Sequence, residues 1–195
     1  MQKNANPVIA PGDTRLSTTT NHLIAAPQQS LEAAATTARA LGYTPLILGS
    51  AIEGEARQVG TVHAGIAQQI WQYEQPVKPP CVLISGGETT VTVTGQSGKG
   101  GRNSEFLLSL AIALKGQAKT WAIACDTDGI DGSEDNAGAL IGPDILQQGR
   151  QKGLDAAKFL LGHDSYSYFQ AVGALVQTGP TLTNVNDFRA ILIDV

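Results

Sequence analysis

The sequence predicts an α/β fold with a mostly parallel sheet and flanking helices in three layers. Short apolar runs alternate with longer helical patterns, and this order is typical of parallel strands joined by right-handed helical crossovers. Residues 44–49 (TPLILG) and 81–85 (CVLIS) are compact apolar runs, as expected of buried strands. Residues 55–74 instead place apolar side chains at helical spacing, which predicts a long amphipathic helix between those two strands.

The part of the chain before residue 81 is predicted to contain two strands and two helices. In order, it comprises an extended polar arm (1–20), a strand (21–26), a helix (31–42), a strand (44–49) and a helix (55–74). Gly42 ends the first helix, and the three prolines of residues 75–80 (QPVKPP) indicate a linker and a domain boundary. Two strands are too few for a self-sufficient sheet of usual size, so we expect residues 1–80 to be the end of a larger domain.

The part after the linker, residues 81–195, is predicted to form a second α/β unit. Its elements in order are strands at 81–85 and 89–95, a helix at 103–114, a strand at 120–125, a helical region at 143–173 and a strand at 188–194. Polar loops follow two of the buried strands, at residues 85–90 and 126–138. Ligands bind beyond the carboxyl ends of strands in open α/β sheets, so we expect these loops to form the binding edge.

Composition excludes several classes of function. The net charge is −4 and no basic cluster or aromatic platform occurs, so a nucleic-acid groove is not expected. No apolar run approaches the length of a membrane span and the polar N-terminus has no signal-peptide pattern, so we expect a cytoplasmic protein. Cys81 and Cys125 should lie at opposite ends of parallel strands as buried thiols. His22, His63 and His163 show no metal-ligand spacing and are interpreted as structural or surface residues.

The glycine-rich stretch 97–106 (SGKGGRNSEF) fits neither common phosphate-binding pattern. A P-loop would need glycine in place of Val93 and serine or threonine in place of Gly100, and the dinucleotide pattern would need glycine in place of Asn103. Unshielded backbone N–H groups before a helix, together with the charge of Arg102, still favour an anion. From these residues alone, an anion site and a plain turn stay equally open.

The acidic loop 126–138 (DTDGIDGSEDNAG) does not fit a calcium-binding EF-hand. That loop needs an oxygen ligand at its fifth position, where Ile130 stands, and glycine at its sixth. Mg²⁺ needs only one or two carboxylates beside substrate phosphates, so Asp128 with Asp131 is a candidate metal site; a solvated acidic turn is the alternative. Glu88, which follows two glycines at the end of a strand, is a further candidate carboxylate.

Four motifs occur together in an order that is highly specific to one protein family. They are SGGETTVTVTG (85–95), GKGGRNSEF (98–106), TDGIDG (127–132) and TGPTLTNVND (178–187). With them, the chain closely resembles the MOFRL domain, the C-terminal half of class II glycerate kinases, a family also labelled hydroxypyruvate reductase of the tartrate-degradation type. The resemblance implies that residues 1–80 are the C-terminal remnant of a Rossmann-like domain and that residues 81–195 are the MOFRL domain.

The resemblance also implies an activity and the residues that perform it. The activity is transfer of the ATP γ-phosphoryl group to the 2-hydroxyl of D-glycerate with Mg²⁺, in which a protein mainly positions groups and neutralises charge. By motif, Arg102, Glu88 and Asp131 are the expected catalytic residues, and Asp128 is the expected metal ligand. The expected substrate and phosphate contacts are Gly86, Gly87, Lys99, Gly100, Gly101, Asn103, Asn184, Asn186 and Asp187.

The chain departs from the family pattern at three positions and in length. Asp126 and Leu182 stand where the family usually has glycine or another small residue, and His163 replaces a usual asparagine. Family members are much longer, so we expect this chain to be a C-terminal portion that lacks the N-terminal half and is almost inactive alone. The unpaired edge of residues 21–49 favours self-association or a polar arm that covers it.

Two alternatives from other functional classes stay open. The family label allows an NAD(P)H-dependent hydroxypyruvate reductase, although the sequence contains no dinucleotide fingerprint. A non-catalytic module that binds nucleotide or anion without turnover is also compatible with the motifs.

Overall fold

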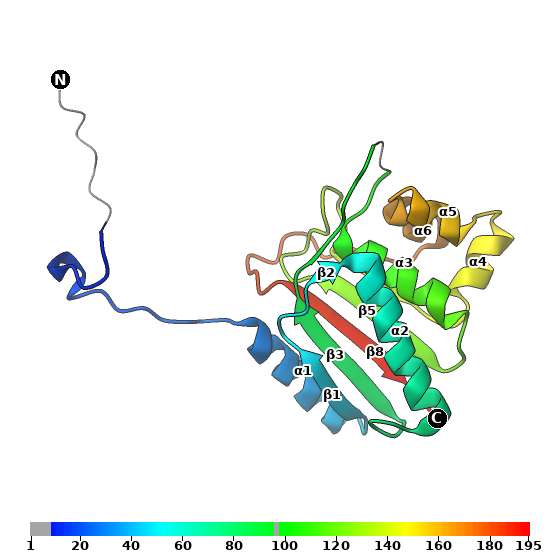
Figure 1. Ribbon diagram of the computed structural model, residues 1–195, viewed down its shortest axis with the longest axis horizontal. Helices are drawn as coiled ribbons and strands as arrows, with labels where there is room; N and C mark the ends of the chain where they lie inside the picture. The colour runs from blue at the N-terminus through cyan, green and yellow to red at the C-terminus, as the bar shows by residue number, and fades with distance from the viewer. Residues whose placement is uncertain (1–8, 96–97) are drawn as a thin grey trace.

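The computed structural model describes residues 9–95 and 98–195 (Figure 1). Its helices are a 3₁₀ turn η1 (Thr14–Leu16), α1 (Pro27–Ala40), α2 (Ala56–Tyr73), α3 (Arg102–Leu114), α4 (Ile145–Gln151), α5 (Ala156–Leu161) and α6 (Ser165–Val172). Its strands are β1 (Thr44–Gly49), β2 (Gly54–Glu55), β3 (Cys81–Gly87), β4 (Thr89–Thr90), β5 (Thr120–Asp126), β6 (Gly138–Ile141), β7 (Leu175–Val176) and β8 (Asp187–Ile193). None of these helices is long and apolar enough to cross a membrane.

The main sheet is mixed, with the strand order β1-β3-β8-β5-β6-β7. The α/β class with flanking helices is confirmed, but the expected predominance of parallel pairing is not found. Among the described strands of this sheet, only β1 and β3 pair in parallel, and the other neighbours are antiparallel. The reason is that the C-terminal strand β8 inserts between β3 and β5 and runs opposite to both.

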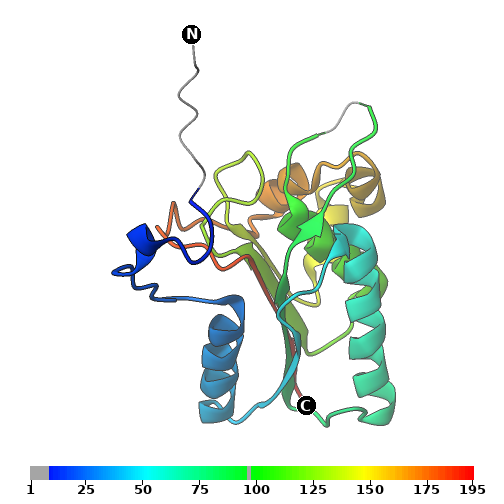
Figure 2. The ribbon, with the colours of Figure 1, turned by 60° about the vertical axis from the view of Figure 1, so that its left-hand side comes forward.

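Helices cover both faces of this sheet, which gives the expected three layers (Figure 2). Helix α1 packs on one face, where its Leu31 belongs to the same hydrophobic cluster as Ile84 of β3, and Phe188 of β8 packs against that cluster. Helices α2 and α3 pack on the other face, where the core includes Phe106 of α3 and Ile191 of β8. Successive residues of β3 and β8 therefore enter opposite cores, as the alternation of side chains along a strand requires.

Several predicted elements differ from the observed ones. Residues 21–26, predicted as a strand, have no regular structure, and residues 9–26 run away from the body of the protein (Figure 1); residues 1–8 of the predicted arm lie outside the described part. The predicted strand 89–95 shrinks to Thr89–Thr90, which pairs with β2 in a separate two-stranded sheet. Strands β6 and β7 were not predicted, because both are short and adjoin polar loops.

The predicted domain boundary at residue 80 falls inside the main sheet. Strand β1 pairs with β3 across that boundary, and α2 and α3 contribute to one hydrophobic core. Strand β1 is an edge strand of the sheet as the structure describes it. The assignment of residues 1–80 to a preceding Rossmann-like domain, and self-association through that edge, stay predictions.

Helices α2 and α3 approach closely at Gly60, which gives a first prediction. A Cβ atom there would lie 2.5 Å from the Phe106 carbonyl oxygen, whereas one at Gly65 of the same helix would meet nothing within 4 Å. Gly60→Ala should lower the free energy of unfolding by about 1–3 kcal/mol through overpacking. The matched control Gly65→Ala should raise it by about 0.5–1 kcal/mol, because alanine is the better helix former. Urea unfolding of both variants checks this; equal effects of the same sign would contradict the close packing.

Candidate functional site

A cleft of about 620 Å³ opens at one end of the sheet, where β4, the glycine-rich loop and the start of α3 meet. The residues that line it are Glu53, Glu88, Thr89, Thr90, Val91, Val93, Gly98, Gly100, Gly101, Arg102, Glu105, Gly132 and His163. Motifs that are far apart in the sequence therefore share one cavity, as the sequence analysis expected for the loops after β3 and β5.

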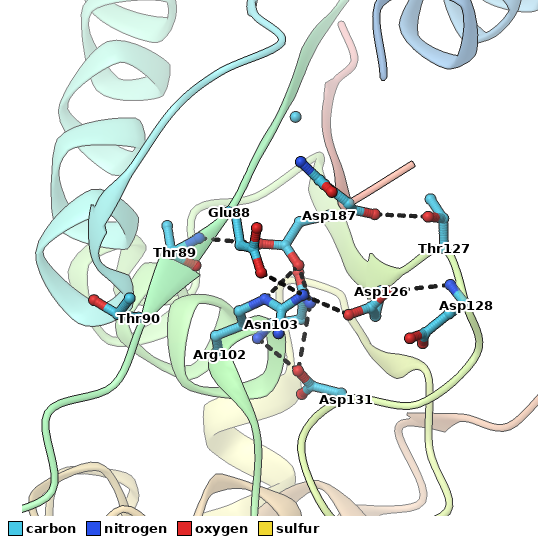
Figure 3. A network of polar contacts seen from close by, with 12 residues as sticks. Glu88, Thr89, Thr90, Arg102, Asn103, Asp126, Thr127, Asp128, Asp131 and Asp187 are labelled. Carbon is cyan, nitrogen blue, oxygen red and sulfur yellow. Dashed lines mark hydrogen bonds and ion pairs between the residues drawn. The ribbon is translucent and has the colours of Figure 1, made fainter. Parts of the chain in front are cut away.

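Arg102, the first residue of α3, is the cationic centre of this region (Figure 3). Its Nη2 atom lies 2.5 Å from Asp126 Oδ2, and its Nε atom lies 2.8 Å from Asp187 Oδ1. Glu88 is more distant, with its Oε1 atom 3.9 Å from Arg102 Nη2, and its side chain is 61% exposed. Arg102 is thus held by two buried carboxylates while its guanidinium still borders the cleft.

Asp187 links Arg102, which is partly exposed, to Arg189, which is buried. Arg189 Nη2 lies 2.5 Å from Asp187 Oδ2 and donates another hydrogen bond to Thr89 Oγ1 at 3.0 Å. Burial lowers the pKa of the Arg189 guanidinium, which the Asp187 carboxylate opposes. Arg189 was not among the predicted site residues, because residues 188–194 read as a plain strand; the available signal is a charged residue among the apolar residues of that strand.

Asp131 does not face the cleft, contrary to its predicted role as a catalytic carboxylate of that cavity. It is 0% exposed, and its two oxygens accept hydrogen bonds from the backbone N–H groups of Asn103 and Ser104, at 2.9 and 2.8 Å. These are donors of the first turn of α3, which a helix leaves without partners inside itself. Gly101 leaves the necessary space, since a Cβ atom there would lie 2.3 Å from Asp131 Oδ1. Asp131 therefore holds the start of α3.

The predicted pairing of Asp128 with Asp131 as metal ligands is not formed; Asp128 instead adjoins Asp126. Its backbone N–H donates to Asp126 Oδ1 at 3.1 Å, and its own Oδ1 accepts from the Ile130 N–H at 2.8 Å. Burial foremost, and then the charge of Asp128, raise the pKa of Asp126 to about 6, although Arg102 opposes the shift. No group of three potential metal ligands occurs within residues 9–95 and 98–195.

The glycine-rich loop packs against the start of α6. The Lys99 N–H donates to Asp164 Oδ1 at 2.9 Å, and a Cβ atom at Gly98 would lie 2.3 Å from Asp164 Cβ. Gly100 has φ +146°, and a Cβ atom there would lie 2.7 Å from Ser165 Oγ. The backbone of this loop borders the cleft, but the Lys99 ammonium is directed to Glu134, 3.4 Å away. Ser97 of the predicted stretch lies outside the described residues.

The remaining predicted contacts, Gly86, Gly87, Asn184 and Asn186, do not line the cleft. Gly86 and Gly87 end β3; Gly87 has φ +118°, and a Cβ atom there would lie 2.2 Å from the Ile52 nitrogen. Asn184 and Asn186 shape the loop before β8, where Asn184 Oδ1 accepts a hydrogen bond from the Asn186 N–H at 2.9 Å. The structure therefore joins Glu88, Arg102, Asn103 and Asp187 in one network, in which Glu88 and Arg102 line the cleft and Asn103 and Asp187 are buried behind it. Their roles in ligand binding stay predictions.

Comparison with known proteins identifies the family. A family model described as the MOFRL family matches residues 81–187, more than half of the chain. The chain belongs to the MOFRL family.

Relatives of this MOFRL-family chain carry two different names. It is 42% identical to a glycerate 2-kinase of Pyrococcus horikoshii over 89% of this chain and 39% of that protein. It is 59% identical to a protein of Agrobacterium vitis that is provisionally named hydroxypyruvate reductase, over 88% of this chain and 39% of that protein. The crystal structure of a glycerate kinase from Thermotoga maritima superposes with a TM-score of 0.85 at 38% identity, covering 88% of this chain and 41% of that one. The chain spans about two fifths of these relatives.

The MOFRL-family match contains most of the site and leaves part of its support outside. Arg102, Asp126 and Asp187 all lie within residues 81–187, with Asp187 the last matched residue. Arg189, which pairs with Asp187, lies two positions beyond the end of the match. The family region therefore depends on strand β8 as a whole to hold its central carboxylate.

The raised pKa of Asp126 gives the prediction from this site. The carboxyl of an unfolded Asp titrates near 4, so the folded protein binds this proton more tightly between about pH 4 and 6. The contribution of Asp126 to stability should consequently fall as pH rises through that window. A ¹³C NMR titration of the Asp126 carboxyl should give a midpoint near 6, and Asp128→Asn should lower it by removing the neighbouring charge. A midpoint near 4 in the parent chain would contradict the burial and charge described here.

Proposed function

We propose that this chain is the C-terminal portion of a glycerate 2-kinase, which transfers the ATP γ-phosphoryl group to the 2-hydroxyl of D-glycerate. The relatives named glycerate kinase support the activity. The observation that carries the proposal is Arg102, a guanidinium at the start of α3 that borders a cleft together with a glycine-rich backbone. That combination suits a polyphosphate, which needs fixed positive charge and close backbone approach.

The chemistry asks the protein for position and charge more than for covalent steps. The N–H groups of Asn103 and Ser104 at the start of α3 are already bonded to Asp131, so the positive charge at the cleft comes from the Arg102 side chain. Arg102 contributes a full charge in a planar fork that fits two phosphoryl oxygens. Asp187 holds the Nε side of that fork, so an entering phosphoryl group would compete with Asp126 for the Nη side.

The residues present fit a magnesium ion in part. Asp128 and Asp126 are adjacent carboxylates, and the raised pKa of Asp126 reflects, after burial, the charge of Asp128. A hard cation prefers such oxygen ligands and would relieve their repulsion. When bound with a nucleotide, the metal would neutralise charge on the phosphates. Asp128 would hold it, as predicted, because both oxygens of Asp126 are engaged by Arg102 and the Asp128 N–H.

The proposal assigns the rest of the catalytic cleft to a part of the enzyme that this chain does not contain. The chain spans about two fifths of its relatives, and positional catalysis requires groups from every side of the reacting atoms. The partners of this chain would therefore be D-glycerate, ATP and the remaining segment. We place the protein in the cytoplasm, where both small molecules occur.

A hydroxypyruvate reductase is the second candidate, because the relative of highest identity described above carries that provisional name. An NAD(P)H enzyme would need a dinucleotide site, and the stretch GKGGRN lacks the third glycine of that fingerprint. Binding of nucleotide without turnover is the remaining possibility. ATP consumption with glycerate, NADH oxidation with hydroxypyruvate, and binding alone distinguish the three.

One prediction of the proposed function concerns the purified 195-residue chain. It should fold, yet its ATP turnover with D-glycerate and Mg²⁺ should be nearly absent, because one side of the cleft is missing. A chimera in which this chain replaces the matching part of the Agrobacterium vitis relative should restore turnover to the range of kinases, about 1–100 s⁻¹. Turnover at that level by the chain alone would contradict its assignment as a portion. NADH oxidation by the chimera, without ATP turnover, would favour the reductase.

Another prediction of the proposed function concerns Arg102 in that chimera. Arg102→Lys keeps the charge but loses the planar fork, so kcat should fall by about 10²–10³-fold, as when a donor that stabilises transition-state charge is removed. Arg39→Lys, the same change on the exposed surface of α1, should leave kcat unchanged. Steady-state ATP turnover measures both. Near-parental activity of Arg102→Lys would exclude the proposed role.

A further inference from the structure

A buried arginine lies behind Arg102 and does not reach the cleft. Arg189 is 1% exposed, and it is not among the residues that line the cavity. Arg102, in contrast, lines the cavity with a side chain that is 23% exposed. Arg189 therefore cannot touch a ligand in the cleft, and its influence on the cleft must pass through the residues between the two arginines.

One carboxylate lies between the two guanidiniums. Oδ1 of Asp187 accepts a hydrogen bond from Arg102 Nε at 2.8 Å, whereas its Oδ2 accepts one from Arg189 Nη2 at 2.5 Å. The other contacts of this carboxylate are divided in the same way, since Asn103 Nδ2 donates to Oδ1 and the Thr89 N–H donates to Oδ2. Each oxygen of Asp187 thus serves one arginine.

Arg189 is fixed in place by the strands and the helix around it. Its Nη1 atom donates to the Gly86 carbonyl oxygen at 3.4 Å, and its Nη2 atom donates to Thr89 Oγ1 at 3.0 Å. Its guanidinium carbon lies 5.1 Å from the centre of the Phe106 ring, a distance typical of a cation–π contact. The positive charge of Arg189 is therefore held beside Asp187 by contacts on several sides.

Stability alone does not account for this second arginine. Burial foremost lowers the pKa of the Arg189 guanidinium; the Asp187 carboxylate opposes that shift, and the charge of Arg102 adds to it. The Nε atom of Arg189 is also buried without a hydrogen-bond partner among the described residues. A buried ion pair is frequently no more stabilising than well-packed apolar residues, so the cost of burying Arg189 points to a role in the site.

The charges around Arg102 indicate what that role is. Arg102 already faces the carboxylate of Asp126, with Glu88 further away. If Asp187 also acted on Arg102 with a full negative charge, little positive charge would remain for an anionic ligand. Arg189 offsets the charge of Asp187 from the other side, because the fields of two close opposite charges largely cancel further away. Asp187 can then orient Arg102 without removing its positive field from the cleft.

We propose that Arg189 is a positioning residue that acts through Asp187 and keeps the charge of Arg102 available to a polyphosphate. Asp187 fixes the orientation of the Arg102 guanidinium, and Arg189 prevents the same carboxylate from neutralising it. The inference rests on the anion-binding role of Arg102 in the proposed function. It adds to the site a residue that never touches the ligand.

Anion binding by the 195-residue chain tests the role of the Arg189 charge. Isothermal titration calorimetry with inorganic tripolyphosphate measures it at low ionic strength, because salt screens such interactions. Arg189→Gln removes the charge but keeps a donor for Asp187, so the dissociation constant should rise about tenfold, as expected for one charge several ångströms from the ligand. Arg189→Lys keeps the charge and should bind nearly as tightly as the parent. Arg150→Gln, the same change on the exposed surface of α4, should leave the dissociation constant unchanged.

A double variant separates an effect of charge from an effect of lost packing. Asp187→Asn combined with Arg189→Gln removes both charges of the pair, so Arg102 should again act on the ligand with its own charge. The double variant should therefore bind tripolyphosphate more tightly than Arg189→Gln alone. If Arg189 only supported the fold, the second substitution would weaken binding further. The sign of the coupling between the two substitutions distinguishes these cases.

The hydrogen bond between Arg102 and Asp187 supplies a structural readout. In ¹H–¹⁵N NMR spectra of the arginine side chains, Arg189→Gln should retain a hydrogen-bonded Arg102 Nε–H signal, because Asp187 Oδ1 still accepts from it. The signal is assigned by its loss in Arg102→Gln. If Arg189→Gln lost both this signal and tripolyphosphate binding, the role of Arg189 would be structural and the proposal would be overturned.

The outcomes separate this inference from the proposed function. If Arg102→Gln abolishes tripolyphosphate binding but Arg189→Gln leaves it unchanged, the role of Arg189 is overturned and the anion site at Arg102 stands. If tripolyphosphate binding survives Arg102→Gln, or the parent chain does not bind it, the anion site that the proposed function requires is overturned and the inference falls with it.

Discussion

The carboxylate of Asp187 is the contact on which the rest of the cleft depends. It lies at the start of β8 and accepts hydrogen bonds from Arg102, Asn103 and the Thr89 N–H (Figure 3). It also accepts one from Arg189. One buried anion thus joins helix α3, strand β4 and the central strand of the sheet. Two guanidiniums share this partner, and a buried charge without compensation is strongly unfavourable. The local structure is therefore stable only when all of these elements are in place.

A second buried carboxylate, that of Asp131, orders the same end of α3 from the opposite side. Asp187 holds the side chains of the first helical residues, whereas Asp131 holds their backbone N–H groups. Gly101 allows the close approach that the second contact requires. The guanidinium of Arg102 is consequently positioned before any ligand arrives, which is the kind of preorganisation that electrostatic catalysis uses.

Local sequence patterns predicted most helices and the long strands, but not how the strands are arranged. The runs TPLILG and TWAIAC became β1 and β5, and the helical pattern of residues 55–74 became α2. The run NHLIAA did not become a strand, because no neighbouring strand pairs with it in the structure. An apolar run indicates burial and does not reveal its neighbour or direction, so the insertion of β8 between β3 and β5 was not predictable from the run itself.

The sequence by itself determined the family, the charged residues available to the cleft and the glycines that let the backbone approach them. Only the tertiary structure decided which of those charges face the cavity. It placed Asp131 against the backbone N–H groups at the start of α3, and Asp126 against Arg102. It also brought His163 to Glu105, a residue 58 positions earlier. Such contacts depend on how helices and strands pack in three dimensions, because sequence spacing places side chains on a common face only within a single element.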